Sequence, residues 1–467
     1  MQGRPRDSSD RELPRGPHSL SREEVLSNQR QRLVAAMSAA VGRQGYAKTT
    51  VANVIAIAGV SRKAFYEHFA NREECFLEMY DTITAESVER VASAYRSADT
   101  LPAAIAAAIE ALFKRAIESP LEVRIALIEI GAVEPAGAER RERLVGTYEQ
   151  LLRESLQLAP GPGTIPNPIL RAIVGGVTHV LHSQVRAGRE RRLHKLVPDL
   201  VSWITSYYPA PEAILSLRDP PPKRPFAGLV GGRAPGSLAP PNPSSSKRRG
   251  LRGEHVSSHS FVVHSQRERI LDAIANLSAS KGYTAVTVKE IAEHAAVSLD
   301  AFYEHYEDKE DAFLVAYEVG HSKNLTIVER AYDAAPDWRS AIRAAIAALF
   351  DFLASEPAFA HLSLVDARIA TDRTVERASR GVGAYAQMLL PGLEGAAGAG
   401  GPPAVAIEAI VGGIFELCLS YTLKHREQEL SELVPRATYF ALAPFVGAEE
   451  AGRLASEPPD HMPPQHF

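Results

Sequence analysis

The chain has 467 residues, of which 45% are hydrophobic, and its formal net charge is -4. This length exceeds one ordinary domain, and the hydrophobic share is enough for packed cores, so a disordered chain is excluded. Only Cys75 and Cys418 are present, which excludes a disulfide framework and a cysteine-rich zinc site and fits a reducing compartment. The net charge hides basic patches such as residues 247–252, KRRGLR, which either solubilise a linker or contact DNA.

The first residues, MQGRPRDSSDRELPRG, contain no apolar core segment, so the sequence predicts no secretory signal. No run of about 18 apolar residues occurs, so we expect no membrane span. These two absences lead us to expect a soluble, cytoplasmic protein.

Taken in order, residues 1–27 are polar and charged, and we expect a disordered tail. Apolar residues then recur at helical spacing over 28–41, and Gly45-Tyr46 ends this helix. The next three helices are each expected to start at a side chain that caps backbone N–H groups, at Thr50, Ser61 and Asn71. Gly59 is the expected tight turn between the second and third helices, because glycine accepts positive φ at little cost.

Residues 89–208 show helical patterns and few strand signals, so we expect an all-α fold. The segment 101–118 is an Ala-rich amphipathic helix, and 168–187 is apolar on more than one side, which predicts burial. Residues 209–262 are rich in Pro, Gly and Ser and read as a flexible linker.

The pattern then restarts. Gly282-Tyr283 repeats Gly45-Tyr46 at an offset of 237 residues (282 minus 45), and the same offset carries AIVGG from 172–176 to 409–413. An offset that does not drift over such a distance indicates duplication of an entire module, well above solenoid periods. We therefore predict this division of the chain: tail 1–27, head 28–88, body 89–208, linker 209–262, head 265–325, body 326–450 and disordered tail 451–467.

The third helix of the first copy places Phe65 and Phe69 on one side, and we expect both in the core. Its other faces carry cationic, aromatic and imidazole side chains that suit the major groove, where Arg and Lys read guanine edges. The side chains that we expect to contact bases or phosphates in this copy are Lys48, Thr50, Arg62, Lys63, Tyr66, His68 and Arg72.

Two stretches, GYAKTTVANVIAIAGVSRKAFYEHFANREECF and GYTAVTVKEIAEHAAVSLDAFYEHYEDKEDAF, carry the repeated motif. Both resemble the TetR (tetracycline-repressor-type) family of transcriptional regulators. The resemblance implies that the third helix enters the major groove and that the helix-start threonine and the aromatic-x-His pair meet phosphates. In the second copy these roles fall on Thr287, Tyr303 and His305, and Lys309 stands in the place of Arg72.

The second copy departs from the first in its candidate base-contacting residues. Leu299 and Asp300 replace Arg62 and Lys63, and Ala296 replaces the turn glycine. An aspartate that faces the groove repels phosphate, although it can accept a hydrogen bond from cytosine N4. The second head therefore either binds DNA more weakly, reads a different half-site, or has lost DNA binding and serves a ligand-sensing or protein-docking module.

The resemblance also implies a helical body with a ligand pocket, for which we expect walls at 101–118 and 338–354. It implies a dimer bundle from the last helices, here 168–187 with 195–208, and 404–425 with 431–446. We thus expect a repressor-type regulator that binds a double-stranded DNA operator and releases it when an unidentified small apolar effector binds. Both heads come either from one chain, as an intrachain pseudo-dimer on an imperfect palindrome, or from a homodimer with four heads.

Two further features each allow two interpretations. Gly175-Gly176 either breaks a helix or lets two helices approach closely, and its recurrence in both copies favours close approach. His179 and His182 are either a metal-binding pair or buried histidines without a metal, and the second copy has Glu416 and Leu419 there, which favours the latter. No catalytic carboxylate pair, nucleophile arrangement or phosphate loop occurs, so we expect no enzyme, no cofactor and no metal.

Overall fold

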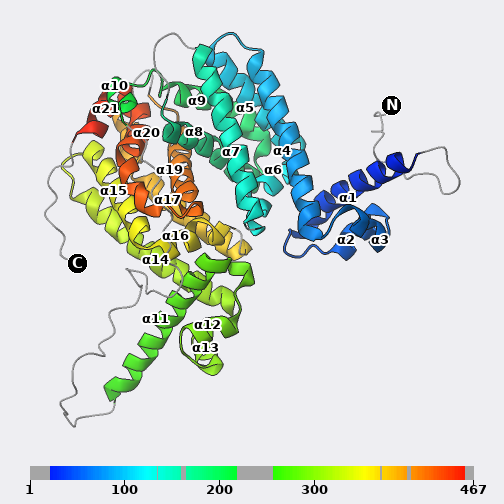
Figure 1. The fold of residues 1–467 in the computed structure, drawn as a ribbon. Coiled ribbons are helices and arrows are strands. Elements are labelled where there is room, and N and C mark those ends of the chain that lie inside the picture. The colour runs from blue at the N-terminus through cyan, green and yellow to red at the C-terminus, as the bar shows by residue number, and fades with distance from the viewer. Residues whose placement is uncertain are drawn as a thin grey trace. The chain divides into compact units, whose positions relative to one another are not determined.

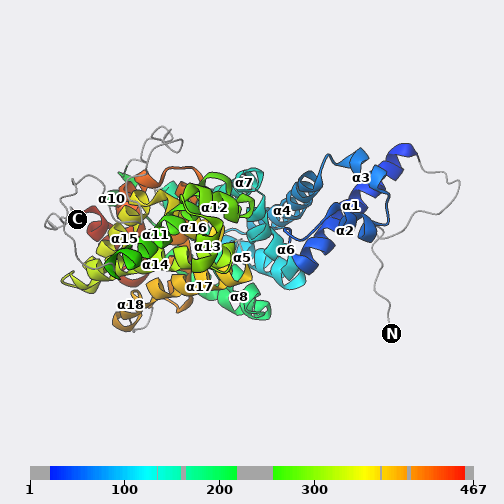
Figure 2. The ribbon, with the colours of Figure 1, turned by 90° about the horizontal axis from the view of Figure 1, so that it is seen from below.

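The computed structural model describes residues 21–133, 135–158, 165–217, 256–368, 371–396 and 401–457. Every regular element in these ranges is a helix, which confirms the all-α prediction (Figures 1 and 2). The chain divides into two compact units. The first holds the described residues up to Asp99, Ala103–Tyr148 and Leu181–His194, and the second holds Thr100–Pro102, Glu149–Val180 and the described residues from Lys195 on.

The helices of the first copy and of the segment that follows it are α1 (Arg22–Gln44), α2 (Val51–Ala58), α3 (Arg62–His68), α4 (Arg72–Arg96), α5 (Leu101–Glu118), α6 (Pro120–Leu127), η2 (Glu129–Ala132), α7 (Ala136–Ser155), η3 (Leu156–Leu158), α8 (Asn167–Arg186), η4 (Glu190–Arg192), α9 (Leu193–Thr205) and α10 (Glu212–Leu215). Those of the second copy are α11 (Val256–Lys281), η5 (Tyr283–Ala285), α12 (Val288–His294), α13 (Leu299–His305), α14 (Lys309–Asp333), α15 (Trp338–Ser355), α16 (Pro357–Leu364), η6 (Asp366–Arg368), α17 (Asp372–Gln387), α18 (Leu390–Gly395), α19 (Val405–Leu423), η7 (Glu427–Leu433), α20 (Val434–Val446) and α21 (Ala448–Ser456). The order of helices is thus repeated, as the fixed offset predicts.

The predicted helix starts carry the predicted caps. The side chains of Thr50, Ser61 and Asn71 each accept a hydrogen bond from a backbone N–H three residues later, and Gly59 has φ of 62°. Asn53 completes a capping box at Thr50 by accepting from the Thr50 N–H at 2.9 Å. These local predictions hold because each depends on residues within one turn of the helix that it starts.

The two predicted tails and the predicted linker are shorter than expected, because helices extend into them in the described part of the chain. α1 begins at Arg22, not near residue 28, because Ser21 and Glu24 form a capping box: Glu24 N donates to Ser21 Oγ at 3.2 Å and Ser21 N donates to Glu24 Oε2 at 2.7 Å. The predicted linker also contains α10 and the start of α11, and the predicted C-terminal tail contains most of α21. The remainder of the tails and linker, including KRRGLR, lies outside the described residues.

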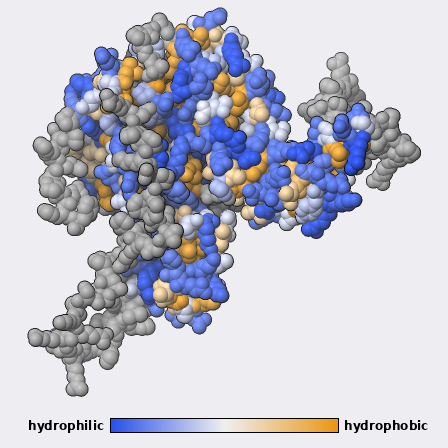
Figure 3. All heavy atoms as spheres, in the orientation of Figure 1, coloured by the Kyte–Doolittle hydropathy of each residue, from blue (hydrophilic) through white to orange (hydrophobic). Residues whose placement is uncertain are grey.

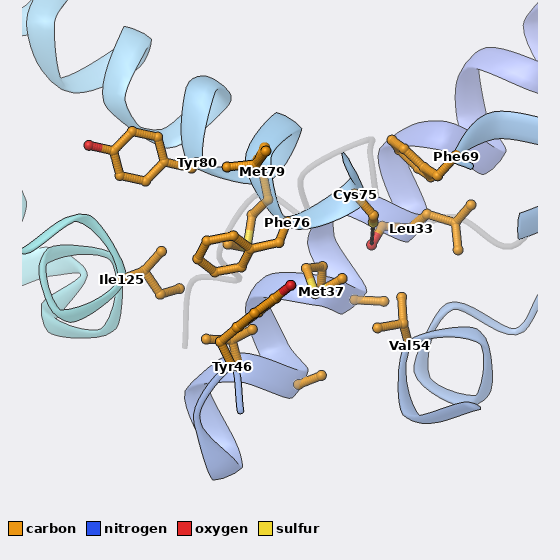
Figure 4. Close-up of a cluster of buried hydrophobic side chains, with 14 of the residues drawn as sticks. Leu33, Met37, Tyr46, Val54, Phe69, Cys75, Phe76, Met79, Tyr80 and Ile125 are labelled. Atoms are coloured by element: carbon orange, nitrogen blue, oxygen red, sulfur yellow. Dashed lines mark hydrogen bonds between the residues drawn. The ribbon is translucent and has the colours of Figure 1, made fainter. Parts of the chain in front are cut away.

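The first head is built around aromatic residues that the motif supplies (Figure 4). Phe65 and Phe69 are fully buried, which confirms their predicted core role, and they join side chains from α1 and α4. Tyr46 lies against Phe76 with ring centroids 4.5 Å apart. In the second head Phe302 takes the equivalent buried position. This core fixes α2 and α3 against α1, so the outer face of α3 is presented by a packed scaffold.

Within the second unit, α8 and α19 meet at the repeated AIVGG segment. A Cβ added at Gly176 would lie 2.5 Å from the carbonyl oxygen of Ala409, and one added at Gly413 would collide in the same way with that of Ala172. Because the two contacts exchange equivalent positions of the two copies, they have the pattern of an isologous interface. The close-approach interpretation of the glycine pairs is therefore confirmed.

α20 extends this contact through buried aromatic residues, packing against Trp203 of α9 and against Tyr207, which follows the end of α9. The Tyr207 hydroxyl donates to the Phe440 carbonyl at 2.9 Å, and the Tyr439 hydroxyl donates to the Tyr207 carbonyl at 3.0 Å. The Tyr207 and Phe440 rings stack with centroids 5.1 Å apart. The bounds of α8, α9, α19 and α20 agree with the expected bundle helices to within a few residues.

One helix in the described part of the chain, α19, is long and apolar enough to cross a membrane, although the sequence pattern predicted none. A bent pair formed by α15 and the segment after it also meets the criterion if taken as one span. Of the apolar window of α19, 78% is buried inside the protein. Its contacts with α8, α16 and α20 therefore account for its apolar surface.

Candidate nucleic-acid interface

The reading helix of the first head, α3, presents three of the predicted contact residues to solvent. Arg62 and Lys63 are exposed at its first turn, and the Lys63 side chain is 88% accessible. Tyr66, one turn later, is 49% exposed, and its ring centroid lies 5.9 Å from the Arg62 guanidinium carbon. Ala64 and Phe65 point the other way, into the core. The helix thus carries two cations and a hydroxyl-bearing ring on its free face, a set that can bind guanine edges and phosphates.

Lys48 and Thr50 lie at the start of α2, and both are exposed. The Thr50 hydroxyl is already used within the head: it accepts from Asn53 N at 3.2 Å and donates to Asn53 Oδ1 at 2.6 Å. Thr287 is exposed too and makes the same bonds with Glu290, whose carboxylate accepts from the Thr287 hydroxyl at 2.7 Å. A phosphate oxygen at either site would have to share these hydroxyl groups.

His68 is half-buried at the end of α3, with Nε2 3.4 Å from Gln29 Oε1 on α1. Burial, and then the nearby Arg30 guanidinium, lower the pKa of His68 below its ordinary value. The imidazole is therefore neutral at pH 7, and a phosphate contact would come from a neutral N–H donor. His305 is half-buried at the equivalent position in the second head.

Arg72 and Lys309 lie where sequence reasoning alone did not place them. Arg72 Nη1 donates to the carbonyl oxygens of Tyr46 at 3.3 Å and Thr49 at 2.5 Å. Lys309 Nζ donates to those of Tyr283 at 2.9 Å and Val286 at 2.8 Å. Both cations thus hold the Gly-Tyr turn of their own head, and each lies 4.2 Å from the tyrosine ring centroid. Their phosphate contacts remain a prediction, which now requires these bonds to open or be shared.

The second reading helix, α13, keeps the scaffold and changes the chemistry. Ser298 caps it by accepting from Ala301 N at 3.1 Å, as Ser61 caps α3. Its free face carries Leu299, 44% exposed, and Tyr303, 56% exposed, together with the exposed Asp300, and apolar spheres show on the visible face of this head (Figure 3). The face therefore offers a carboxylate and an apolar side chain in place of two cations.

The start of α12 adds an ion pair, Glu290 with Lys281, to the second head. The capping residue that is Asn53 in the first copy is Glu290 here, and the Lys281 ammonium, then the Thr287 hydroxyl and N–H, lower the pKa of Glu290 to about 2. Glu290 is therefore ionised at neutral pH. Because Lys281 neutralises Glu290, the weaker attraction of the second head for phosphate rests on Leu299 and Asp300, which replace two cations.

The histidine pair on α8 shows no metal site. No group of three or more His, Cys, Asp or Glu side chains in the described ranges could hold a metal ion. His179 packs against Gly412 of α19, and burial, then the nearby Arg368, lower its pKa to about 4. His179 is thus a neutral side chain packed against α19.

A three-helix head with a capped, outward-facing third helix, present twice, defines the class of helix-turn-helix DNA-binding proteins. The family model for bacterial regulatory proteins of the tetR family matches residues 33–79 and again residues 270–316. The chain therefore carries the N-terminal domain of the tetR family twice, in tandem.

Two curated relatives match the chain locally. It is 39% identical over 64 residues to the uncharacterised HTH-type transcriptional regulator YerO of Bacillus subtilis strain 168, which covers 13% of this chain and 22% of YerO. It is 34% identical over 89 residues to the HTH-type transcriptional activator FasR of Mycolicibacterium smegmatis, which covers 19% of this chain and 40% of FasR. The chain therefore spans less than half the length of these relatives.

Two solved structures are similar over a larger part of their own length. The fatty acid degradation regulator FadR of Bacillus halodurans is 19% identical, with a TM-score of 0.35, over 38% of this chain and 97% of that one. The transcriptional regulator FadR of Bacillus subtilis, solved with stearoyl-CoA, is 15% identical, with a TM-score of 0.34, over 40% and 97%.

Proposed function

We propose that this protein is a sequence-specific, double-stranded-DNA-binding transcriptional regulator in which one chain supplies both heads of a pseudo-dimer. The observation that carries the proposal is the reciprocal contact between α8 and α19, made at equivalent glycines of the two copies. Dimers that bind palindromes use an interface of this kind between two chains. Here the chain makes it with itself.

The alternative, a homodimer of chains with four heads, would need another surface for its bundle. The faces of α8 and α19 that meet at the glycines are already covered: Ala172, Gly176, Ala409 and Gly413 are buried within the single chain. The aromatic contact of α9 with α20 is buried as well, with Trp203 1% and Phe440 0% exposed. A second chain could use these faces only by displacing the first pairing.

The differences between the two reading helices support an operator that is an imperfect palindrome. Arg62 and Lys63 of α3 suit a half-site with guanines and close phosphates. On α13, Leu299 can contact a thymine methyl group and Asp300 can accept from cytosine N4. The two half-sites should therefore differ at the positions that the first turn of each helix reads.

The effector site is proposed in the helical bodies. In the second body, a pocket of about 40 Å³, partly open to solvent, is lined by apolar side chains of α14, α15, α19 and α20 and by Tyr385 of α17. The Tyr385 hydroxyl donates to Asn324, so its polar group is satisfied by the protein. The site therefore suits a small apolar molecule, whose binding would shift the bundle helices and lower DNA affinity, as a repressor requires. α15 lines this pocket, and this supports the proposed wall at 338–354.

Light scattering after size-exclusion chromatography tests the pseudo-dimer. We expect a mass near 50.6 kDa, and a mass near twice this value would refute the one-chain assembly. Selection from a random DNA library tests the regulator. An enriched site with two unequal half-sites supports the proposal, and the absence of any enriched sequence would end it.

The second candidate function is a ligand-sensing or protein-docking module in which the second head no longer binds DNA. Leu299 and Asp300 are the residues that favour it. Replacing Arg62 and Lys63 by alanine, and separately Tyr303 and His305, discriminates between the two. If only the first pair of substitutions weakens DNA binding, the second head is not a DNA reader.

A further inference from the structure

A carboxylate from the body holds the Gly-Tyr turn of each head. Tyr46 N donates to Glu129 Oε2 at 2.9 Å, and Tyr283 N donates to Asp366 Oδ1 at 2.9 Å. Glu129 lies in η2 and Asp366 in η6, at equivalent positions of the two copies, and both are buried. The same contact therefore occurs twice with two different acidic residues.

The carbonyl oxygens of the Gly-Tyr turn are bound by a cation at the start of α4 in the first head and of α14 in the second. Arg72 and Lys309 bind carbonyl oxygens of the turn, while Glu129 and Asp366 bind its N–H. The turn leads directly into α2 or α12, which packs with the reading helix. A change in the body that moves the carboxylate would therefore move the start of α2 or α12, and with it the helix that packs against it, α3 or α13.

The two carboxylates differ in their second partner. Glu129 Oε1 lies 3.2 Å from Arg124 Nη2, whereas Asp366 Oδ2 lies 3.1 Å from His361 Nδ1. Arg124 and His361 are equivalent at the offset of 237 residues (361 minus 124). Arginine keeps its charge at all physiological pH values, whereas histidine changes charge between about pH 5 and 8.

We propose that Glu129 and Asp366 are positioning residues that fix each reading head to its own body, and that the second of these links weakens when His361 loses its proton. This inference rests on the proposed function, because it concerns how the body sets the position of a DNA-reading head. It assigns the two copies different regulation: a permanent link in the first and a proton-dependent link in the second.

The charged and titratable groups near the second link come from several elements: Asp366 from η6, Glu427 from η7, His425 from the turn before η7, Lys309 from α14, Lys281 from α11 and Glu290 from α12. Burial raises the pKa of Glu427 to about 7 and lowers that of His425. Glu427 gains a negative charge as pH rises through about 7, and the loss of the His361 proton removes a positive charge. Without its proton, His361 offers the Asp366 carboxylate a neutral ring in place of a cation, and the link loosens.

Amide hydrogen exchange of the full chain, corrected for intrinsic rates, tests both the positioning role of the carboxylates and the proton dependence of the second link, and it does so without DNA. Over about pH 5.5 to 8.5, we expect protection of the turn at 282–287 to fall by about tenfold, because charge-assisted bonds are the stronger ones, while that at 45–50 stays constant. Asp366→Ala should remove the protection at 282–287 at all pH values, and Glu129→Ala that at 45–50. Unchanged exchange in both alanine variants would overturn the positioning role.

Substituting the second partner of each carboxylate, Arg124 or His361, distinguishes a proton-dependent link from a general loss of packing. Arg124→His replaces a side chain that is 47% exposed, so it should fold, and it should give the first turn a pH profile like the second. His361→Arg should flatten the profile of the second turn. A flat profile in Arg124→His together with an unaltered one in His361→Arg would overturn the proton dependence.

The DNA site enriched from a random library then serves as a separate readout. Glu129→Ala should weaken binding to it, although Glu129 is not on the DNA-facing side of the head. If wild-type protein binds no DNA but the exchange profiles are as expected, the proposed function fails while the link stands. If DNA binding is normal and exchange is insensitive to every substitution, the inference alone fails.

Discussion

Replacing Gly176 or Gly413 by alanine should break the contact between α8 and α19. The added methyl group would meet a backbone carbonyl oxygen of the facing helix, and in Gly176→Ala also the Trp203 ring 2.6 Å away. A carbonyl oxygen in a helix cannot rotate away, so the helices must separate or shift. Overpacking of this kind costs about 1–3 kcal/mol per site. Both substitutions together should cost less than twice the single effect, because a helix separation that relieves one contact also relieves the other.

The chain provides matched controls at Gly146 of α7 and Gly383 of α17, which are also equivalent positions of the two copies. A Cβ at either site meets nothing within 4 Å. Alanine there should stabilise by up to about 1 kcal/mol, since glycine is a poor helix former.

Urea unfolding is the assay, followed by the fluorescence of Trp203 in a Trp338→Phe background, which leaves one tryptophan. Trp203 lies against Gly176, so its signal reports the interface itself. If Gly176→Ala and Gly413→Ala unfold at the same urea concentration as Gly146→Ala and Gly383→Ala, the reasoning on close approach is refuted. A mass near twice that of one chain in the Gly176→Ala variant would show that an opened bundle re-forms between chains.

Three other predictions concern single residues. The folded-state pKa of Glu427, about 7, lies above its ordinary value of 4.5, so the stability that Glu427 contributes is complete below about pH 4.5 and is lost as pH rises to 7. Glu427→Gln should therefore stabilise the protein by about 3 kcal/mol at pH 8 and not at pH 4.5. Thermal unfolding measures this effect, and Glu190→Gln, at the equivalent position of the first copy, is the control. Ala296 has φ of 51°, a left-handed conformation that glycine adopts more easily, so Ala296→Gly should stabilise the protein by up to about 1 kcal/mol. Gly59 has φ of 62°, so Gly59→Ala should destabilise the protein by a similar amount. Chemical unfolding measures both, and effects of the same sign would contradict the argument from backbone strain. Lys63→Ala should weaken binding to the selected DNA and lower the slope of log affinity against log salt by about one, and an unchanged slope would place Lys63 away from phosphate.

Much of the fold was predictable because its signals are local. Thr50, Ser61, Asn71 and Gly59 act within one helix turn, and the sequence alone assigns them the roles that the structure shows. The duplication was predictable for a different reason: a constant offset aligns two whole modules, so a pattern seen in one copy can be compared with the equivalent residues of the other. The missed start of α1 was local too, but its capping box lies in a stretch of otherwise polar composition that favoured disorder.

The candidate site was predictable in its location and less so in its hydrogen bonding. Residues on the free face of α3 are exposed as expected, because helical periodicity alone separates them from the core. Arg72 and Lys309 bind carbonyl groups more than 20 positions earlier, and Glu129 and Asp366 bind an N–H 83 positions earlier. No pattern in one sequence encodes such pairings, although the recurrence of an acidic residue at the same offset was a signal that could have been read.

The reciprocal contact of α8 with α19 has a consequence for gene dosage. In a regulator of two separate chains, the fraction able to bind an operator depends on how much of the protein has paired, so occupancy falls steeply at low expression. A covalently joined pair meets its partner at an effective concentration set by the linker and not by the cell. If one chain supplies both heads, as proposed, occupancy of the operator should rise with the first power of protein concentration, so a cell with very few copies of this chain would occupy its target in a graded, non-cooperative way.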